Sequence, residues 1–426
     1  MAASISLRSY LLVTPTKSSR ECVTLAFPDI SLDHTWYLDE LPFDAFKEDG
    51  HRTKYAGATS SGEPITALDP VLVEALQPHI TNVSPHLPEK VRKQHHVAAL
   101  CFLYILLSLD RSNNTSGCIY TMRSTIPIGA GLGSSASISV CLATAILIQR
   151  HHISGPTSSK TLTPTDSQKA IENHLDVINR WAFVGELCIH GNPSGVDNTV
   201  ATKGKAVLFK RTKPGQNPLV RAMHDFPVLP LLLVDTKQSR STAVEVAKVG
   251  ALRKAHPEVA DLILDAIDKI TESAHELVSS EDFKADDPQS LQKIGELIRI
   301  NHGLLVALGV SHPKLERVRE LIDQADIGYT KLTGAGGGGC AITLVQPSTT
   351  PDMLHQLERR LEDEGFAKYE TTLGGAGVGL REYIKFSQES FLNAETSDDI
   401  EALVQAGKAG FADEWQFWDI ADPLPV

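Results

Sequence analysis

Three glycines and two serines stand together in the segment Pro-Ile-Gly-Ala-Gly-Leu-Gly-Ser-Ser-Ala, directly before an apolar stretch that predicts a helix to about Arg150. Glycine lets the backbone approach an anion closely, and the free N–H groups and dipole of a helix start favour negative charge. A serine hydroxyl can also be a ligand of phosphate-bound Mg²⁺. No GK[ST] ending of a Walker A loop follows, and a tight turn with a serine cap is the alternative. The segment predicts a phosphate-binding loop of these residues: Gly129, Ala130, Gly131, Leu132, Gly133, Ser134 and Ser135.

Two carboxylates, Glu186 and Asp197, lie on either side of a Gly-Asn-Pro-Ser-Gly turn. A chain reversal at this turn would direct both acids into one cleft. One could then hold a metal ion while the other accepts or stabilises the proton of a hydroxyl group, as phosphoryl transfer requires. Taken singly, Glu186 is typical of a solvated helix face, Asp197 of a turn or helix cap, and His190 of a hydrogen-bonded structural histidine.

A second glycine tract contains Gly334, Gly336, Gly337, Gly338 and Gly339 and precedes the apolar stretch CAITLV. Such a run costs backbone entropy, so a packed fold retains it where the chain meets a ligand or another chain segment closely. We expect it between a helix and a strand, and we favour a ligand-binding role over a flexible linker.

A basic loop, DTKQSRST, follows the apolar stretch LPLLLV. Its Lys237, Arg240 and Thr242 would project from a strand end, where basic groups suit a carboxylate substrate. A solvated charge cluster is the alternative for these residues.

The elements that must position these residues alternate along the chain. Apolar spacing with a period of two predicts strands, and helical spacing predicts helices. We expect strands at 4–13, 21–27, 118–124, 205–211, 229–236, 340–345 and 380–386. We expect helices at 67–76, 88–109, 134–150, 169–189, 242–256, 257–279, 288–308 and 313–325. The polar segments 28–63 and 155–168 are expected to be surface excursions, and a domain boundary is expected near 225.

Composition limits the class of protein. The chain has 426 residues, of which 42% are hydrophobic, and a net charge of −12. An anionic ligand must therefore be held by local positive features, and nucleic acid is not an expected partner. The six cysteines are widely spread and form no CxxC pair, which favours a reducing compartment. Without a signal-peptide pattern or a long uncharged apolar stretch, a cytoplasmic protein without membrane contact is expected.

The four segments, in this order and spacing, resemble the GHMP kinases, and HGNPSGVDN with KLTGAGGGGC resembles the mevalonate kinases of that family in particular. The resemblance extends from about Ala2 to Tyr383, with LGGAGVGL similar to the family's closing loop. It implies a two-domain α/β (α+β) fold with the active site between the domains. The N-terminal, ATP-binding domain (1–225) would be ribosomal-protein-S5-like, and the C-terminal domain (226–426) ferredoxin-like.

The resemblance implies ATP-dependent phosphorylation of (R)-mevalonate to (R)-5-phosphomevalonate in isoprenoid and sterol biosynthesis, with Mg²⁺, by a homodimer. Asp197 matches the family's catalytic aspartate, and Ser135 and Glu186 match the Mg²⁺ ligands. Gly129–Ser135 matches the ATP phosphate loop, and Gly334–Gly339 the third motif around the phosphates. Arg240 and Thr242 match positions on the mevalonate side.

The chain departs from the family pattern at its start. It begins inside the second strand, after the place of a lysine and a GEHAVV-like motif, so we expect a shortened gene model of lower stability than a complete relative. Two other functions stay open. One is a GHMP kinase for phosphomevalonate, a sugar or homoserine, and the other is a non-catalytic, nucleotide-binding relative.

Overall fold

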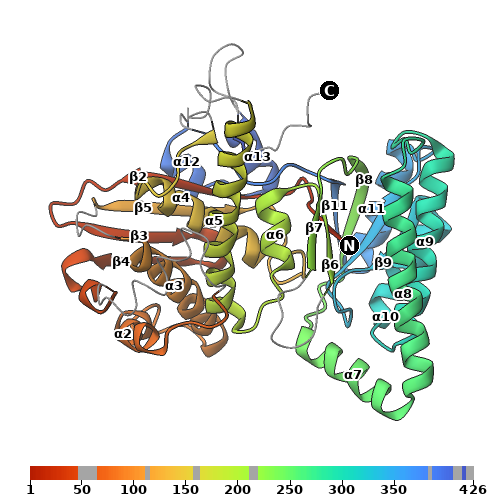
Figure 1. Cartoon of the computed structure of the whole chain (residues 1–426), viewed down its shortest axis with the longest axis horizontal. Helices are drawn as coiled ribbons and strands as arrows, with labels where there is room; N and C mark the ends of the chain where they lie inside the picture. The colour runs from red at the N-terminus through yellow and green to blue at the C-terminus, as the bar shows by residue number, and fades with distance from the viewer. Residues whose placement is uncertain are drawn as a thin grey trace. The chain divides into compact units, whose positions relative to one another are not determined.

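The computed structural model describes residues 1–46, 65–110, 116–156, 164–210, 219–381, 386–405 and 415–418. The chain forms two compact units of mixed helices and sheets, which confirms the expected α/β class (Figure 1). The first unit consists of Met1–Ser6, Pro127–Leu132 and Lys205–Gly375. The second unit consists of Leu7–Ile126, Gly133–Gly204 and Ala376–Val426.

This division differs from a single boundary after residue 225. Strand β6 (Ala206–Lys210) pairs with both β1 (Ala2–Ala3) and β7 (Leu219–Met223), which ties these strands to the first unit. The chain after Gly375 returns to the second unit, where β12 (Gly379–Leu380) pairs with β13 (Gln416–Phe417). Pairing between strands that are distant in sequence therefore determines which segments belong to each unit. Composition along the chain does not predict this pairing.

The second unit is built on a four-stranded sheet in the order β2-β5-β3-β4. Its strands are β2 (Ser9–Pro15), β3 (Cys22–Phe27), β4 (Leu32–Tyr37) and β5 (Cys118–Ser124). Its helices are α2 (Pro70–Thr81), α3 (Glu89–Leu109), α4 (Ser134–Gln149), α5 (Pro164–His190), α6 (Val196–Lys203), α12 (Gln388–Leu392) and α13 (Ser397–Gln405). Short 3₁₀ turns lie at Pro28–Ile30, Leu38–Glu40 and Phe43–Phe46.

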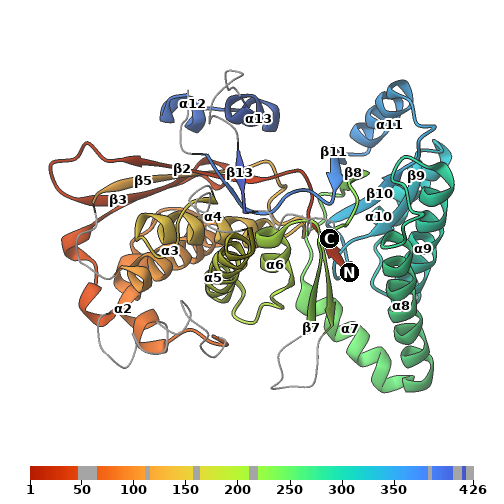
Figure 2. The same cartoon turned by 45° about the horizontal axis from the view of Figure 1, so that its top comes forward.

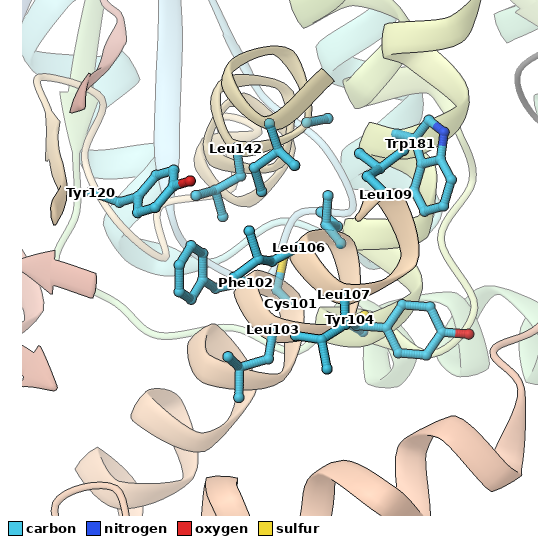
Figure 3. Packing of buried hydrophobic residues seen from close by; sticks show 14 of the residues in the cluster. Cys101, Phe102, Leu103, Tyr104, Leu106, Leu107, Leu109, Tyr120, Leu142 and Trp181 are labelled. Atoms are coloured by element: carbon cyan, nitrogen blue, oxygen red, sulfur yellow. The ribbon is translucent and has the colours of Figure 1, made fainter. Parts of the chain in front are cut away.

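One face of this sheet carries the main apolar core. Figure 3 shows side chains of α3 packed against side chains of β5, α4 and α5, among them Phe102, Leu103, Leu106, Tyr120, Leu142 and Trp181. Each such side chain contributes roughly 1.5–3 kcal/mol when it is removed from water. The predicted helix 88–109, apolar nearly all round, is therefore the buried centre of this unit, as expected.

The C-terminal segment covers the opposite face of the same sheet (Figure 2). Because strand residues alternate between faces, Tyr10 and Leu12 of β2 pack against Phe391, Ile400 and Val404 of α12 and α13. From β5, the buried Arg123 guanidinium donates to the backbone carbonyls of this segment, including that of Phe391 at 2.8 Å. The segment is thus an integral layer of the second unit.

The first unit contains a four-stranded antiparallel sheet in the order β11-β8-β10-β9. Its strands are β8 (Leu229–Asp235), β9 (Gly328–Leu332), β10 (Cys340–Val345) and β11 (Ala367–Leu373). Its helices are α7 (Thr242–Ala255), α8 (Pro257–Val278), α9 (Pro288–Ala307), α10 (Pro313–Gln324) and α11 (Pro351–Asp363). Helices α10 and α11 pack in one apolar cluster with this sheet, and α8 and α9 in another.

Several elements were not expected. The segment 28–46 contains β4, whose Leu32 and Trp36 are buried, so this part of the expected surface excursion is wrong. Strands β9 and β11, and helices α6 and α11, were also missed. Parts of three predictions lie outside the described residues. They are residues 47–64 of the first expected excursion, residues 157–163 of the second, and residues 382–385 of the expected strand 380–386. Among the described residues, no helix combines the length and apolar character that crossing a membrane requires.

Candidate active site

The first glycine segment joins β5 to the start of α4, as the strand–loop–helix prediction requires. Gly129, Gly131 and Gly133 have φ values of 76°, 79° and 74°, a region that side-chain-bearing residues rarely adopt. Ser134 and Ser135 are the first two residues of α4, where backbone N–H groups have no partner within the helix. The loop can therefore offer N–H groups and hydroxyls to an anion.

Glu186 lies in the last turn of α5 and is 4% exposed. Its Oε1 atom has no hydrogen-bond partner among the described residues. Burial raises the pKa of Glu186 to about 7; a hydrogen bond from Ser135 opposes this rise and the charge of Asp197 adds to it. A buried carboxylate with an unsatisfied oxygen is costly unless a cation or donor joins it.

Asp197 lies in the first turn of α6 and is exposed. The chain reverses direction through Gly191 and Gly195, with φ values of 71° and 82°. A Cβ atom built on Gly133 would lie 3.5 Å from the Cβ of Asp197. The starts of α4 and α6 are thus adjacent, and the reversal brings Asp197 near Glu186.

His190 lies next to Ser135 and Glu186, a position that the sequence did not predict. Its Nε2 lies 3.0 Å from the Ser135 hydroxyl and 4.0 Å from Oε2 of Glu186. Burial lowers the pKa of His190, with an opposing effect of Asp197. Glu186 and His190 are four residues apart in a predicted helix, and this i, i+4 spacing could have predicted that the two side chains lie on the same helix face.

The second glycine tract joins the antiparallel strands β9 and β10. The expected helix 313–325 is present as α10, but β9 lies between it and the tract, so the expectation that the tract directly follows a helix is wrong. Gly334, Gly336, Gly337, Gly338 and Gly339 all have positive φ. Backbone hydrogen bonds hold this shape: the Gly337 N–H donates to the Val310 carbonyl at 2.7 Å, and the Gly339 N–H to the Gln238 carbonyl at 3.0 Å. The tract is a shaped loop within the first unit and not a linker.

Arg240 contacts the second glycine tract and Gly131, which belongs to the part of the first glycine segment that lies in the first unit. Its Nη1 donates to the Thr333 carbonyl at 3.0 Å, and its Nη2 to the Gly131 carbonyl at 3.3 Å. A Cβ atom on Gly131 would lie 1.5 Å from Nη2 of Arg240, so a side chain there would displace the guanidinium from its present position, and the φ of 79° also favours glycine. Thr242, two residues later, is exposed and begins α7.

The comparisons with known proteins agree with this geometry. The family model "GHMP kinases N terminal domain" matches residues 99–205, and "GHMP kinases C terminal" matches residues 279–363. Glu186 and Asp197 lie in the first range and the second glycine tract in the other, while Arg240 lies outside both. The mevalonate kinase of Gibberella zeae is 51% identical over 99% of this chain and 83% of its own length.

The chain belongs to the mevalonate kinase family of GHMP kinases.

Other members of this family support the assignment. The mevalonate kinase of Aspergillus fumigatus is 52% identical over 98% of this chain and 78% of its own length, and that of Homo sapiens 33% identical over 89% of each. The solved structure of the Leishmania major mevalonate kinase with R-mevalonate has a TM-score of 0.57 at 20% identity, covering 88% of this chain and 89% of that one. The Methanococcus jannaschii mevalonate kinase gives 0.55 at 21% identity, covering 87% and 90%. Both structures share the two-domain fold.

The residues present fit the Mg²⁺ that kinases of this family are expected to use. Mg²⁺ prefers oxygen ligands. The Oε1 atom of Glu186 is a buried carboxylate oxygen that has no hydrogen-bond partner among the described residues, and the Ser135 hydroxyl lies next to the same carboxylate. Within the described parts of the chain, no group of three or more His, Cys, Asp or Glu side chains could hold a metal. A cation at Glu186 would take its further ligands from other oxygen atoms, such as those of phosphate groups.

Proposed function

We propose that this chain transfers the γ-phosphoryl group of ATP to the terminal hydroxyl of (R)-mevalonate. The products are (R)-5-phosphomevalonate and ADP, and the reaction belongs to isoprenoid and sterol biosynthesis. Family membership over 99% of the chain supports the substrate. The single structural observation that carries the chemistry is the buried Glu186 beside the exposed Asp197 and the Ser135 hydroxyl.

Asp197 is proposed to accept the proton of the mevalonate hydroxyl. The hydroxyl oxygen then forms its bond to the γ-phosphorus while the bond from that phosphorus to the β,γ-bridging oxygen breaks, and ADP leaves. The exposed position of Asp197 leaves its carboxylate accessible to a substrate hydroxyl in this proposal. Its role is that of a proton acceptor, which typically contributes about 10²–10⁴-fold to a rate.

Glu186 and Ser135 are proposed to hold Mg²⁺, which neutralises phosphate charge when it is bound. The backbone of Gly129–Ser135 and of Gly334–Gly339 is proposed to receive the phosphate groups through its N–H donors. Neither glycine segment contains a charged side chain, so their contribution is geometric and dipolar.

Arg240 and Thr242 are proposed to contact mevalonate. The Arg240 guanidinium is a permanent positive charge next to both glycine segments, which supports recognition of the mevalonate carboxylate. A cytoplasmic location and a homodimer are also proposed from the family. Sedimentation velocity of the purified chain tests the homodimer, since a single monomeric species at micromolar concentration would contradict it.

The test is product identification with a panel of acceptors. The purified chain is incubated with ATP and Mg²⁺ plus (R)-mevalonate, phosphomevalonate, galactose or homoserine, and phosphorylated products are identified by ³¹P NMR and mass spectrometry. We expect one monophosphate ester, at the terminal oxygen of (R)-mevalonate. Transfer to another acceptor instead, or nucleotide binding without transfer to any, would overturn the proposal.

A further inference from the structure

The second glycine tract needs external support, because five of its residues lack side chains and adopt positive φ. Glycine has more backbone freedom than any other residue, so it does not hold a shape by itself. The Gly337 N–H is held by the Val310 carbonyl at 2.7 Å. Val310 lies in the short connection between α9 and α10, so the position of this connection sets the position of the tract.

The buried His302 of α9 links the strand before the tract to this connection. Its Nδ1 accepts from the Leu332 N–H at 3.2 Å, and its Nε2 lies 3.1 Å from Oε1 of Glu316. Since Nδ1 accepts, the ring proton resides on Nε2 and is donated to the Glu316 carboxylate. Burial lowers the pKa of His302, which favours this neutral form, while Glu316 opposes the effect.

The pairing of β9 explains why Leu332 needs this acceptor. The Thr333 N–H donates to the Cys340 carbonyl of β10, and donors alternate in direction along an antiparallel pair. The Leu332 N–H therefore points away from β10, toward the open edge of the sheet, where β9 is the last strand. His302 satisfies this edge donor two residues before the tract begins.

Glu316 completes the connection on the other side. It lies in the first turn of α10, and it accepts a hydrogen bond from the hydroxyl of Ser311. Ser311 follows Val310, the residue that holds Gly337. A continuous path thus runs from Leu332 through His302, Glu316 and Ser311 to the middle of the glycine tract, and all of it lies within the first unit.

We propose that His302 is a positioning residue for the nucleotide: by holding Leu332 and Glu316 together, it keeps Gly334–Gly339 in the shape that receives the phosphates of ATP. This inference rests on the proposed function, which assigns the tract to phosphate binding. His302 makes no contact with substrate in this proposal, so it sets the affinity for ATP and leaves the chemical step almost unchanged.

Three substitutions distinguish the contributions of the two hydrogen bonds that the His302 ring makes, one with Leu332 and one with Glu316. His302→Asn retains an acceptor near Leu332 but is too short to reach Glu316, His302→Gln retains a group that can reach Glu316, and His302→Leu removes both bonds. We expect the dissociation constant for MgATP, measured by titration calorimetry without mevalonate, to rise about tenfold for His302→Leu, which corresponds to about 1.4 kcal/mol. It should rise by roughly threefold for the Asn and Gln variants, since each keeps part of the network.

His95→Asn is the matched control, because His95 is also buried and also bonded through both ring nitrogens. Its partners are Ser84 and Ile30 of the second unit, each at 2.8 Å. We expect His95→Asn to lower the melting temperature as much as His302→Asn does, while the dissociation constant for MgATP stays within twofold of wild type. In steady-state assays, the His302 variants should raise KM for ATP and leave kcat and KM for mevalonate within twofold.

The inference is overturned if the His302 variants bind MgATP as wild type does, if His95→Asn weakens binding equally, or if kcat alone falls. Should His302→Leu fail to fold, the Asn and Gln variants decide the question. If the wild-type chain binds MgATP but does not phosphorylate mevalonate, the proposed substrate is wrong. The MgATP affinities of the His302 and His95 variants would still test the role of His302. A wild-type chain that binds no MgATP would refute both.

Discussion

Glu186 and Asp197 carry the same chemical group in opposite environments. Glu186 is 4% exposed at the end of α5, where burial raises its pKa to about 7, whereas Asp197 is exposed at the start of α6. Burial makes an ionised Glu186 costly in free energy until a cation joins it, whereas Asp197 is not buried. We infer from this difference that Glu186 binds the metal and Asp197 accepts the proton, because a buried carboxylate is stabilised by a cation.

The largest expected effect comes from Asp197→Asn. Removing the proton acceptor should lower kcat roughly 10³-fold with little change in KM for ATP, because ground-state binding does not need the charge. The measurement is steady-state ADP formation with mevalonate. Asp176→Asn, which changes an exposed aspartate of α5 that pairs with Lys203, is the control and should retain full activity. If Asp197→Asn kept more than a tenth of the wild-type kcat, the assignment of the proton would be wrong.

Glu186→Gln should affect the metal and not the proton. We expect kcat/KM for ATP to fall roughly 10²-fold and the half-saturating Mg²⁺ concentration to rise, since an amide is a poorer ligand than a carboxylate. A Mg²⁺ titration of activity checks this, with Glu172→Gln on the exposed face of α5 as control. An unchanged Mg²⁺ dependence would remove Glu186 from the metal site.

The same substitution should stabilise the metal-free chain at high pH. The pKa of Glu186 rises from an ordinary 4.5 to about 7 in the folded chain, so the folded state favours the protonated form. Stability from this group is therefore full below about pH 4.5 and is lost as pH rises through about 7. Without Mg²⁺ or nucleotide, we expect Glu186→Gln to raise the free energy of unfolding by about 3 kcal/mol at pH 8 relative to wild type, and by much less at pH 5. Urea denaturation at both pH values measures this, and equal gains would contradict the buried-charge explanation.

The smallest expected effect distinguishes the two serines at the start of α4. Ser135 contacts His190 at 3.0 Å and lies beside Glu186, so Ser135→Ala should lower kcat/KM for ATP by about tenfold, the loss of one ligand. Ser134→Ala should cost less. The reverse order in the same assay would transfer the metal-ligand role to Ser134.

The sequence predicts the parts of the site that depend on neighbouring residues. Glycines before an apolar helix predicted the loop at 129–135, and the Gly-Asn-Pro-Ser-Gly turn predicted the reversal that brings Asp197 near Glu186. The buried helices 88–109 and 134–150 followed from their apolar spacing. In each case the signal lies within about twenty residues, which is the range of helix and turn preferences.

The parts that the sequence did not predict depend on contacts between distant residues. Arg240 reaches carbonyls of Gly131 and Thr333, and His302 reaches Leu332 and Glu316. Nothing in the local pattern of DTKQSRST or of helix α9 identifies these partners. Strand β9 was missed for a similar reason, because the sequence GYTKL has weak alternation and becomes a strand through its pairing with β10.

The measurement that tests the division of labour most directly is ADP formation from MgATP with and without (R)-mevalonate, by wild type and by Asp197→Asn at matched saturation with nucleotide. We predict mevalonate-dependent turnover by wild type, and a variant that binds MgATP as tightly but forms ADP roughly 10³-fold more slowly. Equal turnover by the two chains, or ADP formation that does not depend on mevalonate, would contradict the account.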